Sequence, residues 1–231
     1  ATAGINTDVT TSLNIIAAKD VNTGAINSSN KLKTLTITGQ DTVTTGDASS
    51  TALETVTVSG VKAVQTGAFA NAGKLKTVNV TSTTDNATVS AIGGATNNNT
   101  TDALNITVSA AKAATLGTVG NSAGAGKLGD ISVTATNGLL TAGAITGTDA
   151  GTITLTSTAG AIDGTAAQVT VADATGVTVN MTAKTFITAD GLTGGAAITV
   201  QNTGGNITAS VAGAAAANVN YTAVTKGVVN L

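Results

Sequence analysis

The feature that most constrains the fold is a seven-residue phrase that recurs at nearly constant spacing between residues 32 and 82. Its three copies begin at Leu32, Leu53 and Leu75, which lie 21 and then 22 residues apart, and each reads Leu-x-x-φ-x-φ-Thr/Ser, where φ is an aliphatic residue. This alternation matches the two-residue period of a β-strand. The phrase therefore predicts strands whose aliphatic side chains share one face: Leu35, Ile37, Val56, Val58, Val78 and Val80.

A single strand of this length cannot bury its aliphatic face alone, so the repeat predicts that successive copies stack. Copies about 4.8 Å apart pair their backbone groups and align their aliphatic side chains into ladders. A longer repeat relates residues 24–35 to residues 67–78 at an offset of 43 residues. It predicts that Ile26 and Phe69 occupy equivalent inward positions. We therefore expect an all-β, elongated β-solenoid with stacked coils of about 22 residues, short parallel strands and Gly/Asn turns.

Weaker copies of the phrase predict that the stack extends in both directions. Residues 12–16 predict a first strand, and residues 22–24 predict a turn after it. A polar insertion at 96–101 separates the clear phrases from looser ones. The strands expected after it are 105–109, 130–134, 152–156, 168–171, 176–181, 197–200 and 206–211.

Glycines between these segments predict turns, because glycine adopts the left-handed backbone conformation at low cost. The pairs expected between strands are Asn137-Gly138, Asp163-Gly164 and Asp190-Gly191. No linker rich in proline or charge divides the sequence, so we expect one elongated domain over 1–231, with an irregularity or subdivision near 96–103. The chain opens at Ala1 without a signal segment, which predicts either a removed leader or a piece of a longer protein.

Composition argues against several classes of function. The chain has no histidine and no cysteine, and Glu54 is its one glutamate, so the usual groups for acid–base and nucleophilic catalysis are missing. We therefore expect no enzyme activity. The formal charge is −2 without a basic stripe, which argues against nucleic-acid binding. No apolar run approaches the ~20 residues of a membrane helix, so no transmembrane segment is expected.

Metal binding has weak support in the aspartates. The candidate calcium ligands are Asp41, Asp47, Asp85 and Asp102, because hard cations prefer clustered oxygen ligands. No Asp-x-Asp pair occurs, and isolated aspartates that satisfy turns are the favoured interpretation. Calcium at contacts between copies is the alternative, and no other cofactor is expected.

Rows of threonine suggest a further function. Residues 34–38, 55–57 and 152–156 alternate threonine with aliphatic residues, which predicts flat hydroxyl arrays of the kind that some ice-binding solenoids use. Threonine is also a favoured residue on β-surfaces, and lysine, glutamate and asparagine interrupt the rows. Ice binding therefore ranks below a structural function.

The phrases at 53–59 and 75–81, set in Ala/Thr/Gly/Asn/Val-rich sequence without cysteine, resemble the repetitive β-solenoid region of Gram-negative surface-layer (S-layer) proteins of the Caulobacter and Campylobacter kind. Residues 67–75 also look like the surface leucine-rich repeats of bacterial cell-surface proteins. The resemblance implies a secreted, extracellular structural subunit that tiles the cell surface as a lattice. Its partners would be further copies of itself and cell-surface polysaccharide.

Two alternatives remain open at this point. A solenoid of this kind also suits the stalk or passenger of a filamentous adhesin, or a subunit of an extracellular filament or sheath. All three functions need the same stack. Open strand edges at its ends favour self-association in each case.

Overall fold

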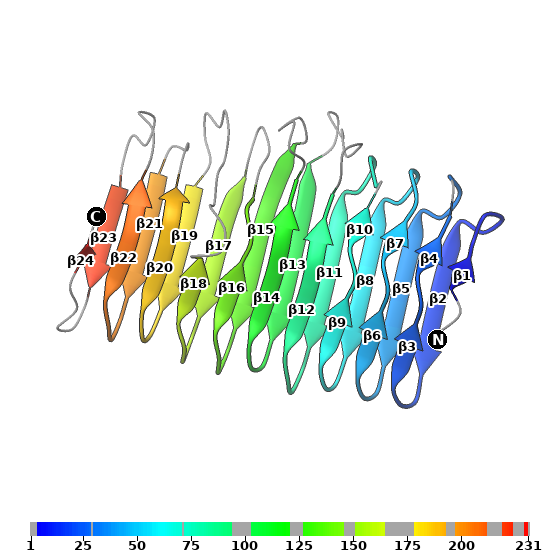
Figure 1. The fold of residues 1–231 in the computed structure, drawn as a ribbon, viewed down its shortest axis with the longest axis horizontal. Coiled ribbons are helices and arrows are strands. Elements are labelled where there is room, and N and C mark those ends of the chain that lie inside the picture. The colour runs from blue at the N-terminus through cyan, green and yellow to red at the C-terminus, as the bar shows by residue number, and fades with distance from the viewer. Residues whose placement is uncertain are drawn as a thin grey trace.

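The strand expected around Leu35 is present as β5 (Thr34–Gly39), and the neighbouring copies of the phrase stack directly on it. The computed structural model describes residues 4–28, 30–70, 72–93, 103–120, 127–145, 151–164, 178–192, 197–211, 219–223 and 229–230. Within them the chain winds into an elongated parallel β-solenoid with no helix (Figure 1). The predicted fold class is confirmed.

One wall of the solenoid is a ten-stranded parallel sheet to which each coil contributes one strand. Its order is β2 (Ser12–Ala17), β5, β8 (Thr55–Gly60), β11 (Thr77–Ser82), β13 (Leu104–Ala110), β15 (Leu128–Ala135), β17 (Thr152–Ser157), β19 (Thr178–Ala183), β21 (Ala197–Asn202) and β23 (Val219–Ala223). The β11–β13 ladder runs over six residue pairs, so this sheet is continuous across the insertion at 96–103.

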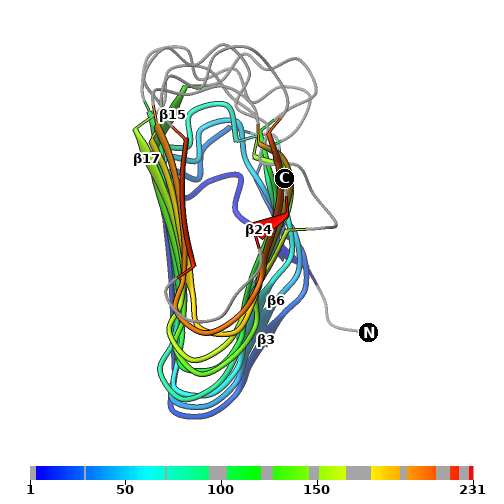
Figure 2. The same cartoon turned by 90° about the vertical axis from the view of Figure 1, so that its left-hand side faces the viewer.

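The opposite wall is a 14-stranded sheet of shorter strands. Its main path is β1 (Ile5–Asn6), β4 (Ile26–Asn27), β7 (Ala48–Ser49), β10 (Phe69–Ala70), β12 (Ala87–Ile92), β14 (Ala114–Val119), β16 (Leu140–Ala142), β18 (Ile162–Gly164), β20 (Ile187–Leu192), β22 (Ile207–Val211) and β24 (Val229–Asn230). Beside it run β3 (Val21–Thr23), β6 (Val43–Thr45) and β9 (Val64–Thr66), which join the path at β12. The two walls face each other across a narrow interior (Figure 2).

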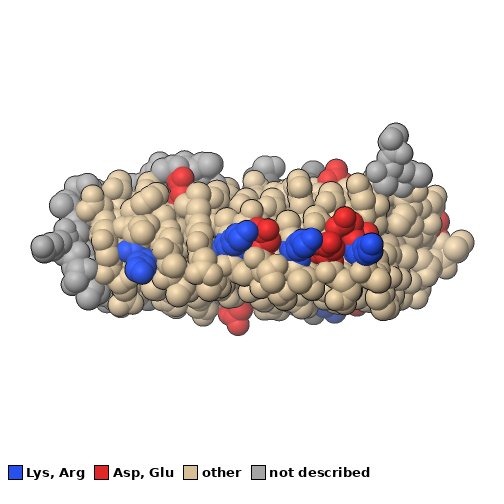
Figure 3. Space-filling view, turned by 90° about the horizontal axis from the view of Figure 1, so that it is seen from below, with Lys and Arg blue, Asp and Glu red and all other residues tan. Residues whose placement is uncertain are grey.

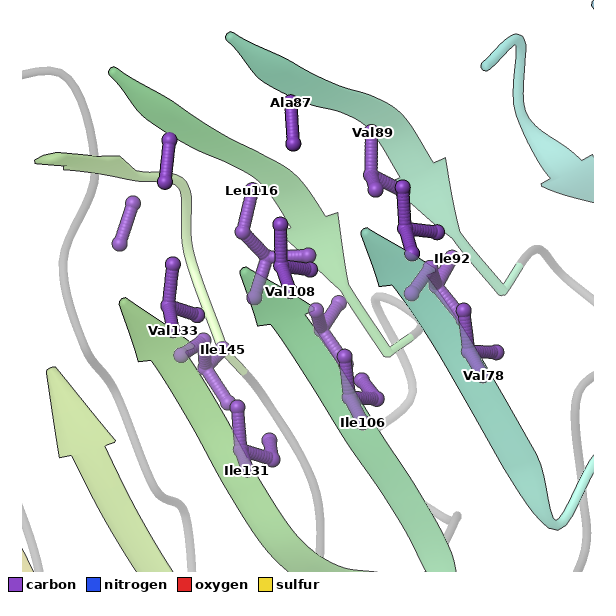
Figure 4. Close-up of a cluster of buried hydrophobic side chains, with 14 of the residues drawn as sticks. Val78, Ala87, Val89, Ile92, Ile106, Val108, Leu116, Ile131, Val133 and Ile145 are labelled. Atoms are coloured by element: carbon purple, nitrogen blue, oxygen red, sulfur yellow. The ribbon is translucent and has the colours of Figure 1, made fainter. Parts of the chain in front are cut away.

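Ladders of aliphatic side chains fill the interior between the walls. Leu35, Val56 and Val78 occupy one register position, and each is at most 1% exposed. Ile26 and Phe69 share a ladder through Ala48, and both are fully buried, as the longer repeat predicted. Further along, side chains from β11 to β15 meet those of β12, β14 and the segment around residue 145 (Figure 4). Because aromatic residues make up only 1% of the chain, stacked aliphatic residues supply the burial that stabilises it.

The ten-stranded sheet ends in a column of small or polar residues at the inner side of a bend. The column includes Gly39, Gly60, Ser82, Ser157 and Asn202. Where a side chain is present it holds the bend by hydrogen bonds: Ser157 Oγ donates to the carbonyl oxygen of Gly138 at 2.7 Å, and Asn202 Oδ1 accepts from Gly204 N at 3.0 Å. These buried polar groups therefore have structural partners.

The structure corrects several turn predictions. Residues 22–23 belong to β3 and Asp163-Gly164 lies in β18, because both pairs are in parallel ladders with neighbouring coils. Asp190-Gly191 lies within β20, at a shift of register between Ala189 and Leu192. Asn137-Gly138 does lie between strands, at the bend after β15. Only Gly93 and Gly120, among the described glycines, adopt the left-handed conformation, with φ of 104° and 98°.

The strand series after residue 152 also differs from the prediction. β17 pairs directly with β19, which aligns Ile153 with Val179, so the next member of the ladder lies 26 residues on and not at Val169. Residues 168–171 lie outside the described part. The phrase at 206–211 does form a strand, β22, but it belongs to the opposite wall.

Candidate functional site

The aspartates considered as calcium ligands occupy separate places along the solenoid. Asp41 lies at the bend before β6 and pairs with Lys62, with 2.5 Å between Oδ1 and Nζ. Asp47 follows β6, and its Oδ1 accepts a hydrogen bond from Ala68 N at 2.7 Å. Asp85 pairs with Lys112 at 3.2 Å. Asp102 lies outside the described residues.

No group of three or more His, Cys, Asp or Glu side chains converges anywhere in the described part of the chain. The three aspartates placed by the structure are instead engaged with a neighbouring coil through one oxygen each. The expectation of calcium therefore stays with contacts between copies. A site there would have to recruit carboxylate oxygens that project from the solenoid surface.

Charges alternate in a column along the bend between the two walls. Val21, Val43, Val64, Ala87 and Ala114 pair in register on five successive coils. The residues two positions before them are therefore also aligned: Lys19, Asp41, Lys62, Asp85 and Lys112. We call this set the charged column. Figure 3 shows blue and red side chains alternating along the bend.

The charged column couples neighbouring coils electrostatically. A hydrogen bond from Lys62 to Asp41, the negative charge of that carboxylate and a smaller contribution from Asp20 raise the pKa of Lys62. The Lys62 side chain is 60% exposed, so solvent screens the pair and its contribution to stability is small. Lys33 and Glu54 form a similar pair, 3.5 Å apart, at the opposite corner.

Asparagine and aspartate side chains also join successive coils by accepting backbone hydrogen bonds. Asp20 Oδ1 accepts from Thr42 N at 2.9 Å, and Asn86 Oδ1 accepts from Ala113 N at 3.0 Å. Asn105 and Asp130 make the same kind of contact to the coils that follow them. These side chains pair backbone N–H groups at corners and at places where a strand ladder begins or shifts register.

The outer face of the ten-stranded sheet is a regular surface. Its register aligns three outward rows, and we call the central row and the bend-side row together the hydroxyl face. The third row contains Thr34, Thr55 and Thr77, and the exposed Asp130 of β15 lies beside it. The central row contains Asn14, Thr36, Thr57, Asn79, Thr107, Ser132, Thr154, Asn180 and Thr199; the bend-side row contains Ile16, Thr38, Ser59, Thr81, Ser109, Thr134, Thr156, Thr182 and Gln201.

The hydroxyl face carries no charged residue in these two rows as described. Lys33 and Glu54, which interrupt the sequence pattern, lie at the corner before the sheet and not on its face. Most of the face residues are half-buried by their neighbours, as in a flat surface, and Ser59 Oγ donates to Thr38 Oγ1 at 3.2 Å across two coils. The alternation of Thr with aliphatic residues predicted this face. The sequence did not predict that the face continues after residue 82, because the loops between the later strands vary in length.

The first coil leaves part of the interior open. Leu13 and Ile15 point inward at the same register positions as Leu35 and Ile37, but they are only partly buried, whereas the latter are at most 1% exposed. Among the described strands β2 pairs only with β5, so its other edge has no partner strand there. Such an edge offers unpaired backbone N–H and C=O groups to another strand.

No family model, curated protein or solved structure matches this chain. No helix in the described residues is long and apolar enough to cross a membrane.

Proposed function

We propose that the chain is a structural β-solenoid of the cell exterior that associates with copies of itself in a surface-layer lattice. The observation that carries this proposal is the continuous parallel stacking of the coils, which can be extended by the same ladder at β2, where no described strand pairs with the outer edge. A second solenoid coil placed there would extend both sheets, bury Leu13 and Ile15, and satisfy the unpaired backbone groups. Head-to-tail contacts of this kind propagate into rows, because each added copy presents the same edge, and a lattice additionally requires lateral contacts between rows, where the proposed calcium would bind.

The chemistry of the chain supports a structural role over a catalytic one. Three ion pairs, Lys33–Glu54, Lys62–Asp41 and Lys112–Asp85, join neighbouring coils at the corners, and the interior contains aliphatic ladders. Parallel ladders with few reactive side chains suit a rigid building element. Export and location on the outer surface follow from the resemblance to surface-layer solenoids and form part of the same proposal.

The test is electron microscopy of the concentrated protein with millimolar calcium and again with chelator. Ordered sheets that dissolve on chelation support the lattice and assign calcium to contacts between copies. Fibres under both conditions overturn the lattice in favour of an extracellular filament or sheath. Dispersed rods under both conditions overturn self-assembly and favour an adhesin stalk.

Two substitutions on β2 test whether the open end makes the contact. Ile15→Lys places a charge over the open interior, and we expect it to abolish the assemblies, since an inward charge blocks strand addition. The control is Ile16→Lys on the same strand, where the side chain is 73% exposed on the outer face, and assembly should persist. Equal loss in both variants, or in neither, would contradict contact through this end.

A further inference from the structure

We propose that the hydroxyl face binds ice. The inference is independent of self-assembly, because it concerns the side of the solenoid and not its end. It rests on three properties of the face: the two-dimensional regularity of its hydroxyl and amide groups, its lack of charge and its rigid support.

Regularity comes from the parallel ladders. Strands in a sheet lie about 4.8 Å apart, and alternate residues along a strand lie about 6.6 Å apart. The central and bend-side rows therefore form a grid with these two repeats over nine successive strands, from β2 to β21. Seen end-on, the strands of the ten-stranded wall lie close together while the bends shift from coil to coil, so little twist disturbs the grid (Figure 2).

Side-chain identity keeps the hydroxyl groups ordered on this grid. Threonine is β-branched and stiff at χ1, so threonines that pair in register, such as Thr36 and Thr57, have few ways to place their methyl and hydroxyl groups. The hydrogen bond from Ser59 to Thr38 shows that hydroxyls on adjacent coils come within bonding distance. Asn79 and Asn180 interrupt the central row with amides, which also donate and accept hydrogen bonds.

The charge distribution favours a neutral ligand. Charges gather at the corners, in the charged column and around Lys33 and Glu54. Asp130 lies on the outer side of β15 beside the hydroxyl face, and the two rows themselves are neutral. A charged polymer would find no counter-charge on the face, and a flat sugar chain would find no aromatic ring in the two rows on which to stack. The surface of a water lattice is neutral and periodic, and it offers a donor or acceptor opposite each hydroxyl.

Rigidity makes many weak contacts effective together. One hydroxyl exposed to water gains little from contact with ice, since it exchanges one water contact for another. A preorganised array avoids the ordering cost of each further contact, because the ladders already fix the side chains. Binding strength should therefore depend on an unbroken face.

The experiment measures uptake of dilute protein into slowly growing ice, relative to the unfrozen liquid, together with growth of ice grains on annealing. The wild-type protein is expected to be enriched in the ice at least several-fold and to slow grain growth. The double variant Thr57→Lys/Thr154→Lys interrupts the central row at two places and should be excluded like an ordinary solute. The matched control is Thr115→Lys/Thr141→Lys on the outer side of the opposite wall, which should retain enrichment.

Circular dichroism checks that each variant keeps its strands, and Thr57→Val/Thr154→Val offers a version that preserves shape and β-propensity. Loss of ice uptake in either folded face variant supports the proposal. Exclusion of the wild-type protein from ice overturns it, as does equal loss in the control. If sedimentation of the dilute protein shows a dimer that the face variants dissolve, and ice uptake is absent, the face joins two copies and the inference fails. Ile15→Lys should leave ice uptake unchanged, so the proposals about the end and the side are tested separately.

Discussion

At the residue scale, glycine in this solenoid mainly permits close approach between coils. A column in the shorter-stranded wall contains Gly24, Gly46, Gly67, Ser90 and Gly117. A Cβ on Gly46 would lie 2.7 Å from the backbone of Gly24, and one on Gly117 would overlap the carbonyl oxygen of Ser90. Glycine is therefore required in this column because there is no room for a Cβ atom, and not because the backbone is left-handed.

Gly117→Ala tests this explanation. The added methyl must push neighbouring coils apart, and overpacking of this kind costs about 1–3 kcal/mol. The control is Thr115→Ala on the same strand, where the side chain faces outward and the change should stay within about 0.5 kcal/mol. Chemical denaturation measures both, and equal effects would contradict the close-approach explanation.

At the element scale, the phrase of alternating residues identified one wall of the solenoid and missed most of the other. The strands β5, β8 and β11 have six residues each, long enough for the two-residue period to show. β6 and β9 have three residues, and a Val-x-Thr triplet is too short to distinguish from a turn. A signal was present, since Val21, Val43 and Val64 recur at the same spacing as the leucines.

The sequence predicts that the outer face carries threonine side chains, but it does not predict how many coils the hydroxyl face spans. Thr34, Thr36 and Thr38 alternate with buried aliphatic residues, and this alternation alone predicts that they face outward. The alignment of Thr107 with Ser132 and Thr154 depends on corner and loop lengths that vary between coils, which no local pattern specifies. Ion pairs such as Lys62 with Asp41 likewise depend on register across coils.

The charged column predicts a pH effect at the element scale. The pKa of Lys62 is raised above its ordinary value of 10.5, so its pairing stabilises the fold fully below about pH 10.5, and this contribution is lost as the pH rises through the folded pKa. Lys62→Gln should lower the melting temperature slightly at about pH 8, and the difference from wild type should shrink above about pH 10.5. Thermal melts across this range measure it. Added salt should shrink the difference at neutral pH as well, and a difference that grows with pH would contradict the assignment.

At the scale of the whole molecule, each coil is stabilised mainly by the coils beside it. Such stacks behave as one-dimensional arrays, in which stability is a sum of coil and interface contributions. The coils with the least buried interior should therefore open first. Leu13 and Ile15 in β2 are partly buried, while Ile106 and Ile131 in the middle are at most 1% exposed.

Ile106→Ala measures how far a defect spreads along this array. The substitution removes a fully buried side chain from β13 at a cost of about 2–5 kcal/mol. We expect faster amide hydrogen exchange in β13 and in its neighbours β11 and β15, with progressively smaller changes toward β5 and β21, because each coil contacts only the adjacent ones. Thr107→Ala on the outer side of the same strand is the control and should leave exchange nearly unchanged. A uniform increase across all coils would show that the solenoid opens as a single cooperative unit, and the same rigidity would then extend to the entire hydroxyl face.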